Sequence, residues 1–137
     1  MHLAAKKAAG ESVHQPLHYY DENVGGMTSL LAAMAAAGVS RLVYSSSAAV
    51  YGTPPVNPVT EDAPLRPESP YGSTKVIGEW MAHDEGVARD LSWVALRYFN
   101  VAGAGADDLG DPSVNNLIPM VFRALDEGRR PQIFGDD

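Results

Sequence analysis

The sequence predicts an α/β protein with a doubly wound parallel sheet. Two observations predict this class. Helix-like and strand-like segments alternate along the 137 residues. The strand-like segments are short and almost continuously apolar, as in parallel strands that are covered on both faces. Because 45% of the residues are hydrophobic, the chain is expected to form a packed core and to be at most one domain.

The first half of the chain contains one predicted helix and one predicted strand. Pro16 suits the first turn of a helix, and the apolar spacing after it continues to Gly38, a typical helix terminator. Residues 41–46 are apolar and rich in β-formers, which predicts a strand. The proline-rich stretch 53–67 is then a loop.

The second half repeats the same alternation. Ser69 precedes a proline and predicts the N-cap of a helix over residues 70–89. Residues 91–98 form the next predicted strand. A last helix begins at Asn116 or the asparagine before it and ends near Gly128, and we expect the chain to become extended after that.

Charge and composition exclude several classes of function. The net charge of -7 is spread without a basic face, so a nucleic-acid partner is not expected. The absence of cysteine excludes disulfides and thiolate metal sites. His14 and His18 have the spacing of metal ligands, but Pro16 separates them and we expect no metal. No apolar run is long enough for a signal peptide or a membrane span, which predicts a soluble, cytoplasmic protein.

Candidate catalytic residues lie where a parallel sheet binds its ligands, beyond the carboxyl ends of the strands. Tyr71 and Lys75 are four residues apart on the second predicted helix and therefore share a face. A lysine ammonium beside a phenol stabilises the phenolate, lowering a tyrosine pKa from about 10 and producing a general base. By itself this pair also fits an ordinary amphipathic helix with a solvated lysine. Ser47, at the end of a strand, completes a triad and favours the catalytic interpretation.

The stretches "VYSSSAAVYG" and "SPYGSTK" resemble the extended short-chain dehydrogenase/reductase family. The resemblance implies a Rossmann-like NAD-binding domain, with residues 1–137 as its central part and the substrate-binding region starting at about residue 112. In that family the tyrosine exchanges a hydroxyl proton with a sugar while hydride passes to or from nicotinamide. The lysine binds the nicotinamide ribose, and the serine bonds the substrate oxygen. These roles would fall on Tyr71, Lys75 and Ser47.

Further stretches resemble the sugar-nucleotide epimerases of this family, which act on UDP-sugars with bound NAD and commonly form homodimers. The resemblance of "HLAAKKAAGES" and of the segment after Pro16 implies cofactor contacts from Leu3, Ala4, Ala5, Lys7 and Glu22, the last standing where an asparagine is usual. "RYFNVAGA" implies Tyr98 and Phe99 near nicotinamide and Asn100 on the sugar diphosphate. "NNLIP" and "QIFG" imply nucleotide contacts from Asn116, Leu117, Gln132, Ile133 and Phe134.

Three alternatives to this assignment can be compared: elimination, the conversion of another sugar nucleotide, and a chain without catalytic activity. Related enzymes that eliminate water or carbon dioxide carry a carboxylate after the catalytic serine, whereas Ala48 and Ala49 follow Ser47 here. The residues leave open the alternative that the protein is an epimerase or reductase acting on another sugar nucleotide. The stretch "GAGADDLG" does not fit a dinucleotide-binding turn, because its aspartates would repel a pyrophosphate. Without such a turn, the chain could also be a non-catalytic fragment, and we expect the 137 residues alone to be inactive.

Overall fold

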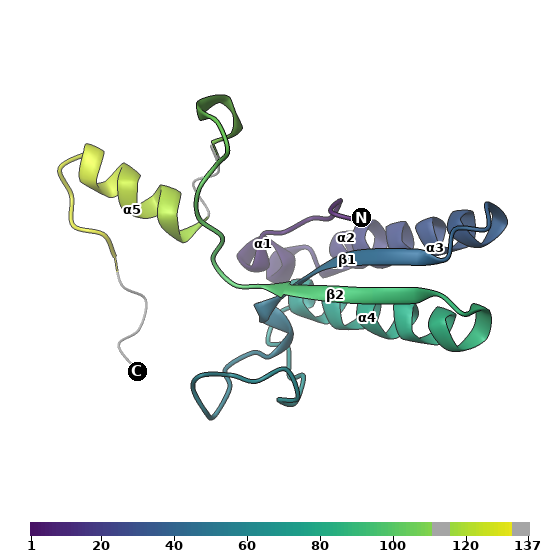
Figure 1. Ribbon diagram of the computed structural model, residues 1–137. Coiled ribbons are helices and arrows are strands. Elements are labelled where there is room, and N and C mark those ends of the chain that lie inside the picture. The colour runs from purple at the N-terminus through teal and green to yellow at the C-terminus, as the bar shows by residue number, and fades with distance from the viewer. Residues whose placement is uncertain (111–115, 133–137) are drawn as a thin grey trace. The chain divides into compact units, whose positions relative to one another are not determined.

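The computed structural model describes residues 1–110 and 116–132. They fall into two compact units, Met1–Phe99 and Asn100–Asp137, which are treated separately below. The first unit contains a parallel sheet and most of the helices (Figure 1).

The helical region at the start of the first unit is longer than the sequence predicts. It contains α1 (Ala9–His14), α2 (Pro16–Tyr19), the π-helix η1 (Tyr20–Gly25) and α3 (Gly26–Ala36). The helix predicted from Pro16 is confirmed, and it ends just before Gly38, whose φ is +68°. α1 was not predicted, because its N-cap residue Ala8 makes no side-chain cap and leaves no signal in the sequence.

Two parallel strands form the described sheet. β1 (Arg41–Ser47) pairs with β2 (Ser92–Tyr98) from Arg41 opposite Ser92 to Ser47 opposite Tyr98. On the other edge of β1, His2 makes a parallel bridge to Tyr44. β1 therefore lies between His2 and β2, and both predicted strands are confirmed to within one residue.

The connection between the strands contains the short 3-10 helix η2 (Ala48–Val50), a loop and the long helix α4 (Pro70–Arg89). The predicted bounds of α4 are confirmed. Ser69 caps its start by accepting the Gly72 N–H at 3.1 Å, and Asp90, in the left-handed conformation with φ 55°, follows its last residue.

The main core lies on one face of the sheet, between the strands and the helices α3 and α4 (Figure 1). Leu42 and Tyr44 alternate toward this face along β1 and pack with the apolar residues of both helices, which are Met27, Leu31, Met34 and Ala82. On the opposite face, Val94 of β2 is 47% exposed. Within residues 1–99, helices thus cover one face of the sheet rather than the two that its apolar strands suggest.

The second unit contains the 3-10 helix η3 (Asp107–Leu109) and the helix α5 (Leu117–Asp126). Asn116 is the N-cap residue of α5, as predicted. The helix ends two residues before Gly128, which has φ +66°. Of the stretch expected to be extended after it, only Gln132 lies within the described residues.

Candidate active site

Three segments of the first unit end at the same edge of the sheet. Residues 3–7, which are exposed, follow the bridge at His2; Ser47 is the last residue of β1; and Phe99 follows β2. Because the three segments are parallel, their carboxyl ends lie along one edge, which is where open α/β sheets bind ligands. The fold therefore gathers three groups of predicted residues there.

Tyr71 and Lys75 share a face of α4 as their spacing predicts. The Lys75 Nζ lies 5.7 Å from the centre of the Tyr71 ring and 5.2 Å from that of Tyr44. It donates a hydrogen bond to the Ser45 carbonyl oxygen at 2.8 Å. The ammonium is thus held between the phenol of Tyr71 and the strand that ends in Ser47.

Lys75 is almost fully buried, with 4% of its surface exposed. Burial lowers the pKa of its ammonium to about 8, because a charge is poorly solvated inside the protein. The pKa of His2 is lowered as well, first by burial and then by the positive charge of Lys75. The buried lysine therefore keeps most of its charge only at neutral and lower pH.

Ser47 approaches the first turn of α4 through the residues that follow it. The Ser47 Oγ accepts the Ala49 N–H at 3.2 Å. The Ala49 carbonyl oxygen packs so closely on Gly72 that a Cβ at Gly72 would lie 2.7 Å from it. Glycine at this position lets the end of β1 come next to the turn that carries Tyr71.

A set of partly buried hydrogen bonds fixes the backbone of Tyr71. Its N–H donates to the Ser12 Oγ at 3.1 Å, and its carbonyl accepts the Thr74 hydroxyl at 2.7 Å. Thr74 in turn accepts the Asn23 side-chain amide at 3.0 Å. Asn23, from the π-helix, also bonds both the N–H and the carbonyl of Lys6. The exposed segment 3–7 and the first turn of α4 are therefore joined.

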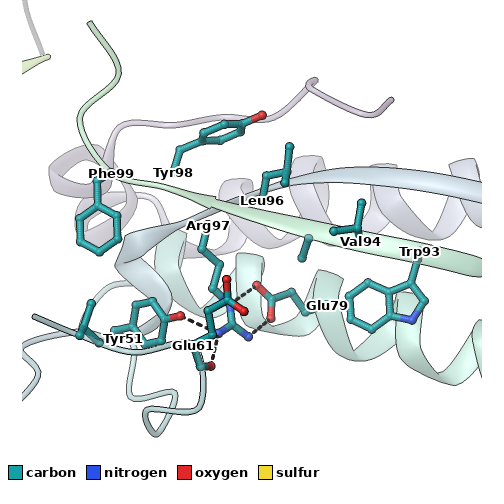
Figure 2. Close-up of a pocket in the computed structure, with 11 residues that line it drawn as sticks. Tyr51, Glu61, Glu79, Trp93, Val94, Leu96, Arg97, Tyr98 and Phe99 are labelled. Atoms are coloured by element: carbon teal, nitrogen blue, oxygen red, sulfur yellow. Dashed lines mark hydrogen bonds and ion pairs between the residues drawn. The ribbon is translucent and has the colours of Figure 1, made fainter.

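A buried ion pair lies one helical turn beyond Lys75. Glu79 of α4 accepts two hydrogen bonds from the Arg97 guanidinium of β2, at 3.0 and 2.7 Å, and one from the Ser46 hydroxyl at 2.5 Å (Figure 2). Arg97 also donates to the Tyr51 hydroxyl and the Glu61 carbonyl. The carboxylate of Glu79 raises the pKa of Arg97 above its ordinary value. This network ties β1, β2, α4 and the loop after η2 together.

A pocket of the first unit lies elsewhere, along β2. It has a volume of about 720 Å³ and is lined by every residue from Trp93 to Phe99, together with Tyr51, Glu61 and Glu79 (Figure 2). β2 pairs with β1 along its other edge, so this pocket follows the edge of β2 that no described strand covers. We attribute it to the open sheet edge and place the candidate site at the carboxyl ends of the strands.

The structure distributes the other predicted site residues over both units. Glu22 is exposed on the π-helix, next to the buried Asn23. Tyr98 is 37% and Phe99 65% exposed at the end of β2. Residues Asn100, Asn116, Leu117 and Gln132 belong to the second unit, and Ile133 and Phe134 lie outside the described residues.

Four residues of this region were not predicted as part of the site: Ser12, Asn23, Glu79 and Arg97. Glu79 and Arg97 are single charged residues within largely apolar segments, such as Arg97 within the strand "SWVALRY". That pattern break was the available signal for these two, since a buried polar group requires a partner. Ser12 and Asn23 directly follow glutamates, so no such break marks them. Sequence spacing does not reveal partners that lie 17 to 59 residues away.

In residues 1–110 and 116–132, no cluster of three or more histidine, aspartate or glutamate side chains has the arrangement of a metal site. No helix in this part of the chain combines the length and the apolar character needed to cross a membrane.

Open parallel α/β sheets bind their ligands at this edge, and comparison with known proteins gives the family. The chain belongs to the NAD dependent epimerase/dehydratase family, which matches residues 1–137. It is 50% identical to UDP-glucose 4-epimerase 4 of Oryza sativa subsp. japonica, in an alignment covering 100% of this chain and 39% of that protein. The resemblance to sugar-nucleotide epimerases is thereby confirmed.

Two solved structures agree with this assignment. The UDP-glucose-4-epimerase from Stenotrophomonas maltophila, with bound NAD and formylated UDP-arabinopyranose, is 42% identical with a TM-score of 0.85, over 99% of this chain and 42% of that one. The UDP-N-acetylglucosamine 4-epimerase from Methanobrevibacter ruminantium M1, in complex with UDP-N-acetylmuramic acid, is 36% identical with a TM-score of 0.85, over 98% and 43%. The chain therefore spans about two fifths of the length of these relatives.

Proposed function

We propose that the protein of full epimerase length that contains this chain interconverts UDP-glucose and UDP-galactose through a 4-keto sugar, using tightly bound NAD. The observation that carries the proposal is the contact between the Lys75 ammonium and the Tyr71 ring at the sheet edge where Ser47 and residues 3–7 also lie. The identity to UDP-glucose 4-epimerases over the whole chain supports it.

The chain's own residues suit the binding of NAD. Ser45 accepts one of the three N–H groups of the buried Lys75, and ribose hydroxyls are acceptors for the others. The exposed backbone of Leu3, Ala4 and Ala5, with Lys7, would hold the cofactor beside it, and Phe99 would contact its flat ring. We also propose that Glu22 contacts NAD. When bound, NAD supplies a reversible hydride acceptor for the sugar carbon.

Tyr71, Lys75 and Ser47 then have distinct tasks. The Tyr71 phenol oxygen takes the proton of the sugar hydroxyl as the carbon is oxidised and returns a proton when the carbon is reduced. Lys75 stabilises the negative charge on that phenol oxygen. Ser47 donates a hydrogen bond to the reacting sugar oxygen and holds it in line with Tyr71.

The second unit would hold the rest of the substrate. We propose that Asn100 contacts the sugar diphosphate and that Asn116, Leu117 and Gln132, with Ile133 and Phe134, contact the nucleotide. Asn116 precedes the first turn of α5, whose free N–H groups favour an anion. This unit is accordingly the start of the substrate-binding region.

A second candidate is the epimerisation of another UDP-sugar. The likeness to the Methanobrevibacter enzyme, named for UDP-N-acetylglucosamine, favours this candidate. Elimination is a poorer fit, because Ala48 and Ala49 of η2 offer no carboxylate to move a second proton. A non-catalytic chain is the remaining alternative from a different class.

We also propose that the full-length protein is a homodimer, paired through α3 and α4. Trp80 is 59% and Val87 78% exposed on α4, and large apolar side chains on an exposed helix face favour burial against a partner. Sedimentation of the full-length protein would test this, since a monomer at micromolar concentration contradicts it.

The activity is tested by incubating the purified full-length protein with UDP-galactose and, separately, with UDP-N-acetylgalactosamine. We expect UDP-glucose from the first. The Tyr71→Phe variant should still bind the UDP-sugar but turn over at least about 10²-fold more slowly, because it lacks the proton-transfer group. Conversion of only the N-acetylated sugar would establish the second candidate, and no conversion of either would refute both.

A further inference from the structure

The first turn of α4 is capped by two serines, only one of which is local. The first N–H groups of a helix have no acceptor within the helix. Pro70 has no N–H, and Ser69 accepts the Gly72 N–H. The Tyr71 N–H instead donates to Ser12, which is 59 residues earlier in the sequence. The residue proposed as the general base is therefore held through its backbone by a side chain of α1.

Ser12 is itself rigidly placed. It is 0% exposed, and its hydroxyl donates to the Ala9 carbonyl at 2.5 Å, which leaves a lone pair of its oxygen for the Tyr71 N–H. The neighbouring Glu11 accepts the hydroxyl of the buried Tyr19 at 2.7 Å. Burial, followed by the bond to Glu11, raises the pKa of Tyr19 to about 12, so this hydroxyl stays a donor. α1 is thus fixed against α2.

α1 directly follows residues 3–7 in the chain. A bond from α1 to Tyr71 therefore sets the distance between this exposed segment and the first turn of α4. Asn23 makes a parallel link, from Lys6 to Thr74. Ser12 differs from Asn23 because it bonds Tyr71 itself.

We propose that Ser12 is a positioning residue for the reaction: it holds the Tyr71 phenol at the correct place relative to the segment that contacts NAD. This role rests on the proposed function, in which residues 3–7 contact NAD and Tyr71 transfers the proton. Ser12 touches neither cofactor nor substrate. It acts through the Tyr71 N–H alone.

The effect of losing this bond follows from how steeply rate depends on geometry. A displacement of about 1 Å can cost up to about 10²-fold in rate. The first turn of α4 should move by less than this when only its bond to Ser12 is lost. We expect Ser12→Ala to lower turnover about 10-fold. The KM for the UDP-sugar should change by less than about 2-fold, because the groups that bind the nucleotide are unaltered.

The test compares Ser12→Ala and Ser12→Cys in the full-length protein loaded with NAD. Turnover is divided by the measured amount of bound NAD, so that unfolded molecules do not count. Ser12→Cys keeps the volume and a weak acceptor, and should fall between wild type and Ser12→Ala. Ser29→Ala removes an exposed serine that bonds only within its own helix. Met34→Ala weakens the buried core without touching Tyr71, and both controls should keep normal turnover per NAD.

A second readout does not depend on turnover. Amide hydrogen exchange of Tyr71 should be slow in the wild type and about 10-fold faster in Ser12→Ala, because a buried hydrogen bond is lost. Normal turnover per NAD in Ser12→Ala would overturn the proposal. If Ser12→Ala does not fold, the proposal would be overturned by normal turnover per NAD in Ser12→Cys, with Met34→Ala equally normal. An unprotected Tyr71 amide in the wild type would overturn it too. If the wild type converts no UDP-sugar, the proposed function fails, while the exchange rates still decide whether Ser12 holds Tyr71.

Discussion

At the scale of single residues, the buried Lys75 makes the stability of the protein depend on pH. Burial lowers its pKa in the folded protein from 10.5 to about 8. Between these values the unfolded chain binds a proton that the folded protein does not, so the free energy of unfolding rises with pH across this window. Below about pH 8 both states are protonated, and the buried charge destabilises the protein by about 3 kcal/mol.

In the protein from which NAD has been removed, Lys75→Met should therefore raise the free energy of unfolding at neutral pH. The gain in the free energy of unfolding should shrink by about 3 kcal/mol between pH 7 and pH 10.5, because at pH 10.5 the folded lysine is neutral and half of the unfolded chains have lost this proton as well. Urea unfolding of the full-length protein at the two pH values measures this, with Lys6→Met, at an exposed position, as the matched control. An equal gain at both pH values would show that burial of Lys75 has no such cost.

Individual residues of the site differ in how well the sequence predicts them. Tyr71 and Lys75 have a fixed spacing on a helix, and Ser47 ends a recognisable strand, so local rules are sufficient to group them. Glu79 and Arg97 form an equally definite contact, but each is a single charged residue in an apolar segment. Their pairing depends on how α4 crosses the sheet, which no local pattern encodes.

At the scale of elements, the close approach of η2 and α4 depends on Gly72. A Cβ there would lie 2.7 Å from the Ala49 carbonyl and 3.0 Å from the Pro67 Cβ. Gly72→Ala should destabilise the full-length protein by about 1–3 kcal/mol, as overpacking does, and should lower turnover because the turn with Tyr71 has to shift. Thermal unfolding and the epimerase assay measure the two effects.

Gly26→Ala is the control for this substitution. Nothing lies within 4 Å of a Cβ at Gly26 in α3, and alanine is the better helix former by up to about 1 kcal/mol. The control should be neutral or stabilising. Equal behaviour of the two variants would mean that η2 and α4 are not in contact at Gly72.

The ion pair of Glu79 and Arg97 joins α4 to β2. Arg97→Met should cost about 3–5 kcal/mol of unfolding free energy, because it leaves the Glu79 carboxylate buried without its partner. The double variant with Glu79→Met should recover most of this loss. Chemical denaturation of the single and double variants measures both effects, and Arg89→Met, which breaks the exposed pair with Glu85, should cost less than about 1 kcal/mol. A double variant no more stable than Arg97→Met would contradict this account.

The elements were predicted unequally for physical reasons. α4 has a serine cap and a proline at its start, and the described bounds match the prediction. α1 has neither signal. In the π-helix, Asn23 bonds Lys6 and Thr74, and these partners belong to distant parts of the chain, so no local signal predicts this element.

At the scale of the whole molecule, the 137 residues alone should neither hold NAD tightly nor interconvert UDP-glucose and UDP-galactose. The sequence contains no glycine-rich dinucleotide turn, which normally anchors the pyrophosphate. The outer edge of β2 and the face with Val94 also stay exposed, which favours aggregation or partial unfolding. Calorimetric titration of the purified chain with NAD, together with an assay, tests this. A well-folded chain with micromolar affinity and turnover would contradict it.

The overall class was predictable because alternation of apolar strands and helices is a property of the whole pattern. The parallel order of the strands followed from it and is confirmed. Within residues 1–99, no helix covers the second face of the sheet. Apolar strands indicate that a face is buried, but they do not say whether the covering segment lies within these 137 residues.

The contrast between buried and exposed ion pairs has a consequence for ionic strength. At molar salt the Debye length falls to about 3 Å, and pairs in contact with water, such as Arg89 with Glu85 and Arg123 with Glu127, are screened. Glu79 is 5% and Arg97 23% exposed, so dissolved ions reach this pair poorly. Concentrated salt should therefore weaken the exposed ion pairs but not the pair of Glu79 and Arg97. The contacts that this pair makes between β1, β2 and α4 should persist at high ionic strength.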